Sequence, residues 1–250
     1  MESKVEAPHY FLFDGEYKCN FPSFYQTAGF EWVKMLEDNW HVVRDEMLQH
    51  LIPESIPIPN YNPNLVADAR LWRNICFYNY MWKKPAACKR YPKTYALLQR
   101  IPNLSYAALN MLEPNSEIYP HQGDTNITAR CHLGLLIPAG LPDCGMKVNG
   151  TETGWEEGKI FAFSDAHWHS AWNHTSQHRY VFVIDVVLDT YANQRQVYCS
   201  KILSALTLKA ISYKIRIPVL HILPVSVARF LHFSISSLWL MYLRIQDKYL

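Results

Sequence analysis

Two segments of this sequence combine strand-like apolar runs with an unusual density of polar side chains. They are YPHQGDTNITARCHLGLLIP at residues 119–138 and WEEGKIFAFSDAHWHSAWNHTSQHRYVFVIDVV at residues 155–187. Burying histidine and arginine in strands is costly unless something pairs with them. The two segments therefore predict either a bound ligand or a buried polar network.

His121 and His169 are the candidate metal ligands. Neutral imidazole is a good ligand for iron(II), and histidines on different strands of a barrel can meet at its mouth. Many non-haem iron sites add a carboxylate in a His-x-Asp arrangement, but the residue two places after His121 is Gly123. Either water or Asp124 would then fill that coordination position. His167 is the main rival to His169, because the H-W-H run puts both on one face of a strand.

Two arginines are candidates for holding an anion. Residues i and i+2 of a strand face the same way, so Arg130 and His132 point together toward one ligand. Arg179 precedes YVFVIDVV, which puts a guanidinium at the edge of an apolar wall, where its planar fork suits a carboxylate. The alternative is that both arginines are structural ion-pair partners of Asp165 and Asp185.

The helices that flank these segments are predicted from apolar spacing. Trp32, Leu36, Trp40 and Val43 recur at helical intervals, which predicts one helix within residues 24–51. Residues 52–66 carry four prolines and are expected to form a loop. A shorter helix is expected over residues 93–100.

From Ser105 onward the pattern changes to short apolar runs broken by Pro, Gly, Asn and Asp. These runs are rich in β-branched and aromatic residues, which is typical of strands. The predicted strands are SYAALNML, ITARCHLGLLIP, CGMKVNG, GKIFAFS, HSAWN and RYVFVIDVVL. Strands at this spacing predict a closed or doubly layered, mainly β architecture.

The chain is expected to comprise a catalytic domain over residues 1–200, with its β core at about 105–190, and an apolar helical extension over residues 201–250. Between residues 217 and 243 the only fixed charge is Arg229, but prolines and histidines make this stretch a poor membrane-spanning helix. We expect residues 202–250 to pack on their own domain or on a partner. Association with a membrane surface is the alternative.

Composition excludes some classes of protein. The formal charge is only +2 and its Lys and Arg residues are scattered, so a nucleic-acid partner is not expected. The six cysteines include no C-x-x-C pair and are expected to be reduced. The first residues lack the continuous apolar stretch of a secretory signal, which predicts an intracellular, cytoplasmic location, with membrane association as an alternative.

Several motifs in register resemble the aspartyl/asparaginyl β-hydroxylase family of iron(II) and 2-oxoglutarate oxygenases, over about residues 20–190. The motifs are LEDNW at 36–40, YPKT at 91–94, HQG at 121–123 with Asn126, RCHLGL at 130–135, WEEGK at 155–159, FSDAHWHSAW, and Arg179 followed by VIDVV. The resemblance implies a double-stranded β-helix, also called a jelly roll or cupin-like fold. It also implies iron(II), 2-oxoglutarate and O2 as cofactor and cosubstrates.

The resemblance further implies roles for individual residues. His121 and His169 match the iron ligands, and Gly123 matches a glycine that the family carries in place of the acidic ligand. Arg179 matches the arginine that binds the distal carboxylate of 2-oxoglutarate. Two further residues are expected to contact the cosubstrate: His132 and Asn110. Three are expected on the substrate side: Arg130, Asn126 and Trp172.

The expected activity is hydroxylation, or another oxidation, of an unactivated C–H bond in a small amino-acid or peptide-like substrate. One alternative is a lipid acyl chain oxidised at a membrane surface. A second is a β-helix that binds a ligand without catalysis, and a third is a zinc hydrolase, for which Asp124 is the candidate base. His167, His174 and His178 are expected to be satisfied core residues.

Overall fold

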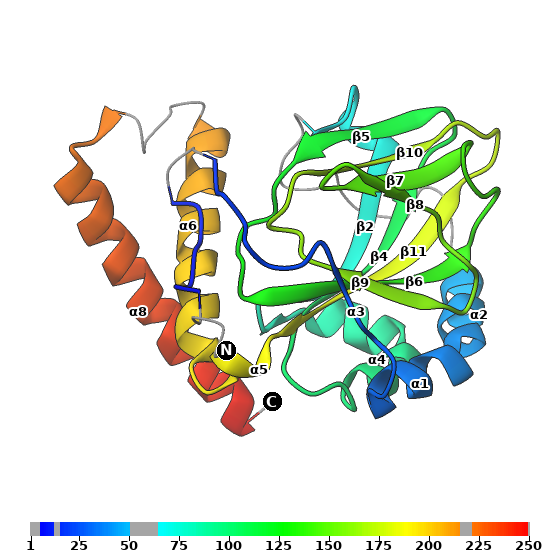
Figure 1. Ribbon diagram of the computed structural model, residues 1–250. Helices are drawn as coiled ribbons and strands as arrows, with labels where there is room; N and C mark the ends of the chain where they lie inside the picture. Colours follow the sequence, from blue (N-terminus) through cyan, green and yellow to red (C-terminus); the bar gives the residue numbers. More distant parts are fainter. Residues whose placement is uncertain (1–5, 13–15, 51–64, 216–221, 250) are drawn as a thin grey trace, which may run out of the picture.

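The computed structural model describes residues 6–12, 16–50, 65–215 and 222–249. Two antiparallel sheets face each other (Figure 1), and their strand orders are β1-β9-β6-β11-β4-β2-β3 and β5-β10-β7-β8. The larger sheet contains β1 (Phe24–Tyr25), β2 (Trp72–Asn79), β3 (Trp82–Lys83), β4 (Leu104–Leu112), β6 (Thr128–Leu136), β9 (Ile160–Phe163) and β11 (Arg179–Val187). The smaller contains β5 (Ser116–His121), β7 (Cys144–Val148), β8 (Thr151–Thr153) and β10 (His169–Asn173). The predicted double-stranded β-helix is confirmed.

The alternation of side chains along each strand decides which residues lie between the sheets. In β11, Val181 and Val183 belong to the core between the sheets, whereas Phe182 and Ile184 belong to the core under the helices. Arg179 therefore shares the inner side with Val181 and Val183. In the middle of β4 and β6 the odd-numbered residues face the helices, so Asn110, Arg130 and His132 lie on the inner side.

Four helices cover the outer face of the larger sheet (Figure 1). They are α1 (Glu31–Asp38), α2 (Trp40–His50), α3 (Pro85–Arg90) and α4 (Pro92–Leu98). The prediction of one helix within residues 24–51 was wrong. The chain forms strand β1 at residues 24–25, and helix α1 ends at Asn39, whose side chain donates to the Met35 carbonyl oxygen at 2.8 Å.

The remaining predicted strands and helix can be compared with the observed elements. The six predicted strand runs coincide with β4, β6, β7, β9, β10 and β11, and the helix predicted over 93–100 coincides with α4. Strands β2 and β5 were not among the predicted runs. A short 3-10 helix, η3 (Ala69–Leu71), precedes β2. The loop predicted over 52–66 lies almost entirely outside the described residues.

The chain ends in a helical hairpin that packs on its own domain. After α5 (Asp189–Ala192), helices α6 (Arg195–Ile215) and α8 (Val225–Tyr249) lie side by side, with α8 outermost (Figure 1). Ile202 and Leu243 of the hairpin join one buried cluster with Met81 and Val187. Both helices overlap the extension predicted over residues 201–250, but α6 is continuous across residue 200, and the division of the chain at that residue stays a prediction. Within the described residues no helix has the length and apolar character needed to cross a membrane.

Candidate active site

The structure brings His121 and His169 together. His121 ends β5, His169 begins β10, and the two residues are directly opposed in this antiparallel pair. Their ring centroids lie 4.1 Å apart. The two histidines that were expected to meet from different strands are therefore adjacent, and their role as metal ligands stays a prediction.

Hydrogen bonds prepare both rings to act as ligands. The Nδ1 atom of His121 lies 2.8 Å from the Tyr119 carbonyl oxygen, and that of His169 lies 2.9 Å from the His167 carbonyl oxygen. A carbonyl oxygen only accepts, so each Nδ1 carries the proton and each Nε2 keeps a free lone pair. Burial lowers the pKa of His121 to about 4 and that of His169 well below its usual value, so both rings are neutral.

This donor set fits iron(II) held by two histidines. Neutral imidazole Nε2 atoms suit iron(II), and the remaining coordination positions are then open to small molecules. Within the described part of the chain, no group of three or more His, Cys, Asp or Glu side chains could hold a metal ion. Asp124, the predicted alternative ligand, accepts a hydrogen bond from the Tyr80 hydroxyl at 2.9 Å. Asp124 is also the candidate base of the zinc hydrolase alternative, and its carboxylate is the group that accepts this hydrogen bond.

A carboxylate from another loop stands beside Gly123. The Gly123 N–H donates to the Asp165 carbonyl oxygen at 2.6 Å, and a Cβ on Gly123 would collide with the Asp165 carboxylate. Asp165 is buried, and its Oδ1 atom has no hydrogen-bond partner among the described residues. Burial raises the pKa of this carboxyl to about 7, although the Arg130 guanidinium acts in the opposite direction. Sequence reasoning treated Asp165 only as an ion-pair partner and missed this placement.

Arg179 is a buried guanidinium to which the described residues offer no carboxylate. It begins β11, is 2% exposed and lies over the Trp155 ring at 4.5 Å from the ring centroid. Its Nε atom has no hydrogen-bond partner among the described residues, and no ion pair to it is found there. Burial lowers the pKa of Arg179 to about 10. A cation in this setting is stabilised by an anionic ligand, so the ion-pair alternative does not hold for Arg179.

His132 is fixed by Trp155. The Trp155 Nε1–H donates to His132 Nδ1 at 3.2 Å, and the two rings are stacked with an interplanar angle of 13°. Burial lowers the pKa of His132 well below its usual value, so the ring is neutral. Because Nδ1 accepts, the proton sits on Nε2, which is then a donor. Trp155 thus contacts both His132 and Arg179, a connection that sequence reasoning missed.

Asn110 lies on the inner side of β4. Its side-chain oxygen accepts from Trp72 Nε1 at 3.1 Å, and its amide nitrogen donates to the Ala108 carbonyl oxygen at 3.2 Å. Asn110 is buried and is opposite Val181 of β11. These bonds leave part of its hydrogen-bonding capacity unused. Its role toward a cosubstrate stays a prediction.

Arg130 forms the ion pairs that the alternative reading foresaw. Its Nε and Nη2 atoms donate to the Asp185 carboxylate at 2.8 and 2.7 Å, and its Nη1 lies 3.0 Å from Asp165 Oδ2. Its side chain is 19% exposed. Arg130 therefore holds two buried carboxylates in place, one of which is the carboxylate beside Gly123. Contact with a substrate stays a prediction for this residue.

Two of the residues predicted to contact a substrate, Asn126 and Trp172, have protein partners in the structure, and their substrate role stays a prediction. The buried Asn126 accepts from the His9 N–H and donates to the Ala7 carbonyl oxygen and the Tyr17 hydroxyl, so both of its amide hydrogens are used. Trp172 lies on the outer face of its sheet, because His169, Ala171 and Asn173 take the buried positions of β10. The Trp172 Nε1–H donates to the Pro142 carbonyl oxygen at 2.7 Å.

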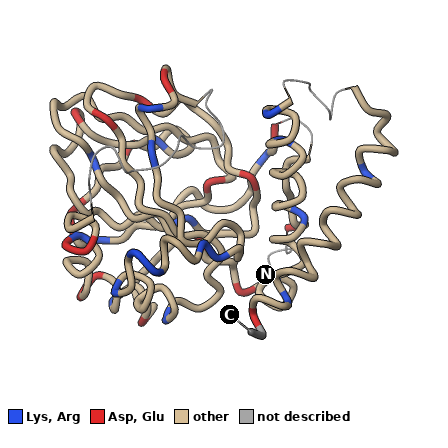
Figure 2. The backbone as a smooth tube through the Cα atoms, turned by 180° about the vertical axis from the view of Figure 1, so that it is seen from behind, with Lys and Arg blue, Asp and Glu red and all other residues tan. Residues whose placement is uncertain are grey.

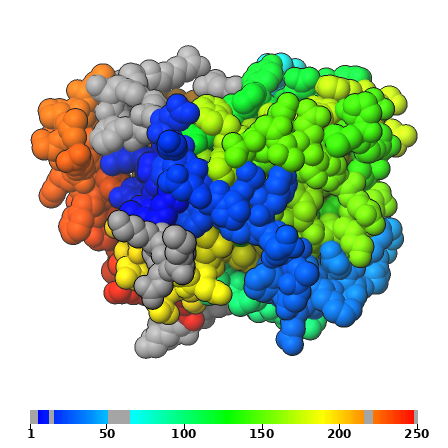
Figure 3. All heavy atoms as spheres, viewed as in Figure 1, coloured from blue at the N-terminus to red at the C-terminus, as the bar shows by residue number. Residues whose placement is uncertain are grey.

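The residues that engage Asn126 belong to an N-terminal strap, defined as residues 6–12 and 16–23. The strap lies between the C-terminal hairpin and the barrel (Figure 3). It contacts the loops next to both candidate ligands, because Gln122 exchanges hydrogen bonds with the Tyr17 backbone and also donates to the Ala166 carbonyl oxygen. His167 Nε2 lies 2.7 Å from the Phe21 carbonyl oxygen. The expectation that His167 is a satisfied core residue is confirmed.

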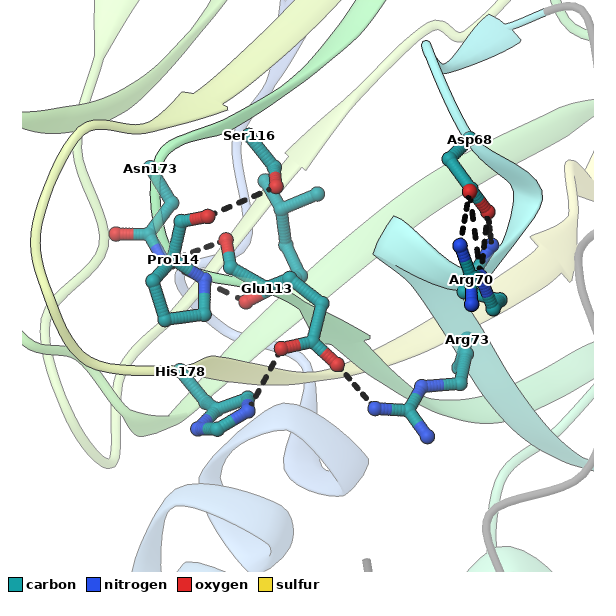
Figure 4. Close-up of polar contacts among 9 residues, drawn as sticks. Asp68, Arg70, Arg73, Glu113, Pro114, Ser116, Asn173 and His178 are labelled. Atoms are coloured by element: carbon teal, nitrogen blue, oxygen red, sulfur yellow. Dashed lines mark hydrogen bonds and ion pairs between the residues drawn. The ribbon is translucent and has the colours of Figure 1, made fainter. Parts of the chain in front are cut away.

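A cluster of polar side chains connects the ends of β2, β4 and β10 next to the start of β11 (Figure 4). Glu113 pairs with Arg73 of β2 and with His178 Nε2, the latter at 2.8 Å, while the Asn173 amide donates to the Glu113 carbonyl oxygen at 3.1 Å. His174 pairs with Glu117 at 2.9 Å. His174 and His178 are thus satisfied, but they are exposed rather than core residues as predicted.

Comparisons with known proteins identify the family of this chain. A family model described as aspartyl/asparaginyl beta-hydroxylase matches residues 37–188. The ornithine lipid ester-linked acyl 2-hydroxylase of Rhizobium tropici is 31% identical over 176 residues, which cover 68% of this chain and 62% of that protein. The human aspartyl/asparaginyl beta-hydroxylase is 33% identical over 167 residues, which cover 64% of this chain and 22% of that protein. The chain thus spans less than two thirds of the length of these relatives.

Solved structures are more distant. A prolyl-4-hydroxylase of Pseudomonas putida superimposes with a TM-score of 0.40 at 12% identity, covering 62% of this chain and 98% of that one. HygX of Streptomyces hygroscopicus, solved with nickel and 2-oxoglutarate bound, gives a TM-score of 0.40 at 10% identity and covers 61% of this chain and 79% of that one. The match of the family model to more than half of the sequence decides the classification. The chain belongs to the aspartyl/asparaginyl β-hydroxylase family.

Proposed function

We propose that this chain is an iron(II)- and 2-oxoglutarate-dependent hydroxylase. The observation that carries the proposal is the combination of two neutral imidazoles, each with a free Nε2, and a buried guanidinium with no carboxylate partner among the described residues. Aromatic rings connect these groups. The ring centroid of Phe163 lies 5.5 Å from that of His169 and 5.1 Å from that of His132. Trp155 contacts His132 and Arg179.

Each polar group then has one task. His121 and His169 would hold iron(II) through Nε2, and Arg179 would bind the distal carboxylate of 2-oxoglutarate with its planar fork. His132 would donate its Nε2–H to the same cosubstrate. With O2, the bound iron and 2-oxoglutarate would supply the oxidation of an unactivated C–H bond, giving succinate and carbon dioxide as coproducts.

The protein also controls water and protons around the proposed metal position. The apolar residues between the sheets, among them Phe163 and Val181, exclude bulk water from the inner side. Asp165 is the carboxylate that stands in the side-chain space of residue 123, and its raised pKa allows it to hold a proton or to accept one near neutral pH. Arg130 keeps it there.

The substrate belongs to one of two classes. An amino-acid or peptide-like substrate was predicted from the family resemblance and from Arg130, but the Arg130 guanidinium is held by two carboxylates. A lipid acyl chain is favoured by the exposed apolar face of α8 and by the likeness to the Rhizobium tropici acyl 2-hydroxylase. The lipid acyl chain is therefore the second candidate substrate, and it is to be tested beside amino acids and peptides.

The test is oxygen-dependent conversion of 2-oxoglutarate to succinate, measured by mass spectrometry with panels of amino acids, peptides and acyl lipids in detergent micelles. The proposal expects substrate-dependent succinate and a product that is heavier by one oxygen atom. The variant Arg179→Met is the matched negative control at low 2-oxoglutarate. Iron binding without succinate formation for any panel member would instead support a non-catalytic binding module.

A further inference from the structure

The outermost helix of the molecule presents an apolar face to solvent. On α8 most of the exposed large apolar side chains form one stripe, named here the α8 stripe: Val227, Phe230, Phe233, Leu238, Met241 and Ile245. Phe230 and Phe233 are 68% and 70% exposed. The opposite side of the helix is buried against the rest of the molecule, where Ala228 and Leu243 are fully covered. The stripe is therefore an outward apolar face that the fold itself does not use.

The polar atoms on this face are already satisfied. Ser234 and Ser237, which interrupt the α8 stripe, donate their hydroxyls to the Phe230 and Phe233 carbonyl oxygens, each at 3.0 Å. A hydroxyl bonded within its own helix is cheap to transfer out of water. The stripe can therefore enter an apolar layer without leaving an unpaired serine.

Basic residues accompany the stripe. Helix α6 contains Lys and Arg residues but no Asp or Glu, and α8 contains Arg229 and Arg244 with Asp247 as its acidic residue. Lys and Arg positions are spread along both helices (Figure 2). Because the whole chain carries a formal charge of only +2, the basic excess is concentrated in this hairpin and the remainder of the chain is net acidic.

We propose that the α8 stripe docks this protein on an anionic lipid membrane, with α8 lying in the plane of the interface. An apolar face flanked by basic residues matches acyl chains below and anionic headgroups around it. A second copy of the chain fits less well. Two such faces would bring Arg229 and Arg244 of both copies together, with little acidic complement on either side.

This inference concerns docking rather than chemistry, so it stands for either substrate class of the proposed function. The test uses the full chain and vesicles of phosphatidylcholine, with and without phosphatidylglycerol, in a sedimentation assay. The wild type is expected to bind the anionic vesicles, and high salt is expected to weaken that binding. Failure to bind anionic vesicles would overturn the proposal.

Variants locate the binding surface. Phe230→Ser with Phe233→Ser is expected to lower the vesicle partition coefficient at least about tenfold, because two exposed aromatic side chains leave the interface. Arg229→Glu and Arg244→Glu are expected to lower it about fivefold each, on anionic vesicles only. The matched control is Phe30→Ser with Leu48→Ser, which removes exposed apolar side chains, 51% and 49% exposed, from the helices under the barrel. The control is expected to bind like the wild type.

Folding, dimerisation and turnover of the variants are measured beside vesicle binding. Circular dichroism checks that each variant folds, and Leu238→Ser, at a position 63% exposed, replaces the phenylalanine pair if that variant does not fold. Equal vesicle binding by the wild type and the phenylalanine variant would overturn the proposal. A second result would also overturn it: the wild type forms a dimer, the substitutions dissociate that dimer, and neither protein binds vesicles. The α8 stripe would then be covered by a second copy of the chain. Turnover with a water-soluble substrate is expected to be unchanged in the phenylalanine variant, which separates loss of docking from loss of the active site.

Discussion

The carboxylate of Asp165 fills the space that a side chain on Gly123 would need. The two residues belong to loops that are distant in the sequence, and they are also joined by a hydrogen bond from the Gly123 N–H to the Asp165 carbonyl oxygen at 2.6 Å. Arg130 holds the carboxylate from its other side at 3.0 Å. Glycine at position 123, two residues after His121, thus leaves the space that the Asp165 carboxylate occupies.

Alanine at position 123 tests this relationship. Gly123→Ala is expected to lower the free energy of unfolding by about 1–3 kcal/mol, because its Cβ must displace a buried charged group. Urea unfolding of Gly123→Ala, Asp165→Ala and the double variant closes a double-mutant cycle. The double variant is expected to be more stable than the sum of the two single effects by about 1 kcal/mol or more. Strict additivity of the two effects would show that the residues do not compete for space.

The raised pKa of Asp165 predicts a pH dependence of stability in the metal-free protein. Its folded-state pKa of about 7 lies above its ordinary value, so the folded protein binds this proton more tightly than the unfolded chain does. Stability from this group is therefore present at low pH and is lost as pH rises toward 7, by at most about 1.4 kcal/mol per pH unit.

The variant Asp165→Asn isolates this contribution, because it keeps the side-chain size and removes the titrating proton. The stability of the wild type relative to Asp165→Asn is expected to fall between about pH 4 and pH 7. Urea unfolding of both proteins across this range measures the difference. A difference that is independent of pH, or that rises with pH, would contradict the assigned shift.

Arg179 is predicted to bind 2-oxoglutarate rather than to stabilise the fold. Arg179→Met is expected to raise the KM for 2-oxoglutarate at least about thirtyfold, which corresponds to the roughly 2 kcal/mol or more lost when one partner of a buried charge pair is truncated. The KM of Arg179→Lys is expected to lie between those of the wild type and Arg179→Met, because an ammonium group keeps the charge but cannot form the planar fork. The thermal stability of the metal-free Arg179→Met protein is expected to equal or exceed that of the wild type, since an unpaired buried charge is removed. A large loss of stability with an unchanged KM would assign Arg179 a structural role instead.

Trp155 is predicted to act by orienting His132. Trp155→Phe keeps the aromatic ring but removes the Nε1–H that fixes the proton of His132 on Nε2. The KM for 2-oxoglutarate is expected to rise about fivefold to tenfold, the effect of losing about 1 kcal/mol of hydrogen bonding. Trp82→Phe is the matched control, because Trp82 packs against Trp239 of the hairpin. Equal KM values for Trp155→Phe and this control would remove the orienting role.

The sequence predicted most of the elements that position the site, because their apolar alternation is strong. The strand that begins at Arg179 has an almost continuous apolar run, and it was predicted to within one residue. Strand β2 was missed because WRNICFYN mixes charged, amide and apolar residues without clear punctuation. The break between α1 and α2 depends on the side-chain bond of Asn39, which apolar spacing does not report.

The site residues divide in the same way. His121, His169 and Arg179 were singled out by their motifs; the structure puts the two histidines opposite each other and buries Arg179, and the roles of all three stay predictions. The two-residue period of a strand does predict that Trp172, which lies an odd number of residues from His169, faces the other side of β10. The engagement of Asn126 could not be foreseen, because the strap that binds it comes from the far end of the sequence.

Metal affinity is the most direct test of the two-histidine centre. Titration of the metal-free protein with manganese(II), a redox-inert stand-in for iron(II), is expected to show one site in the wild type and in the surface control His178→Ala. His121→Ala and His169→Ala are each expected to weaken that site at least about a hundredfold, because losing a direct ligand costs no less than losing an outer-shell partner. If either alanine variant binds manganese as tightly as the wild type, the paired imidazoles are not the metal site and the proposed function is wrong.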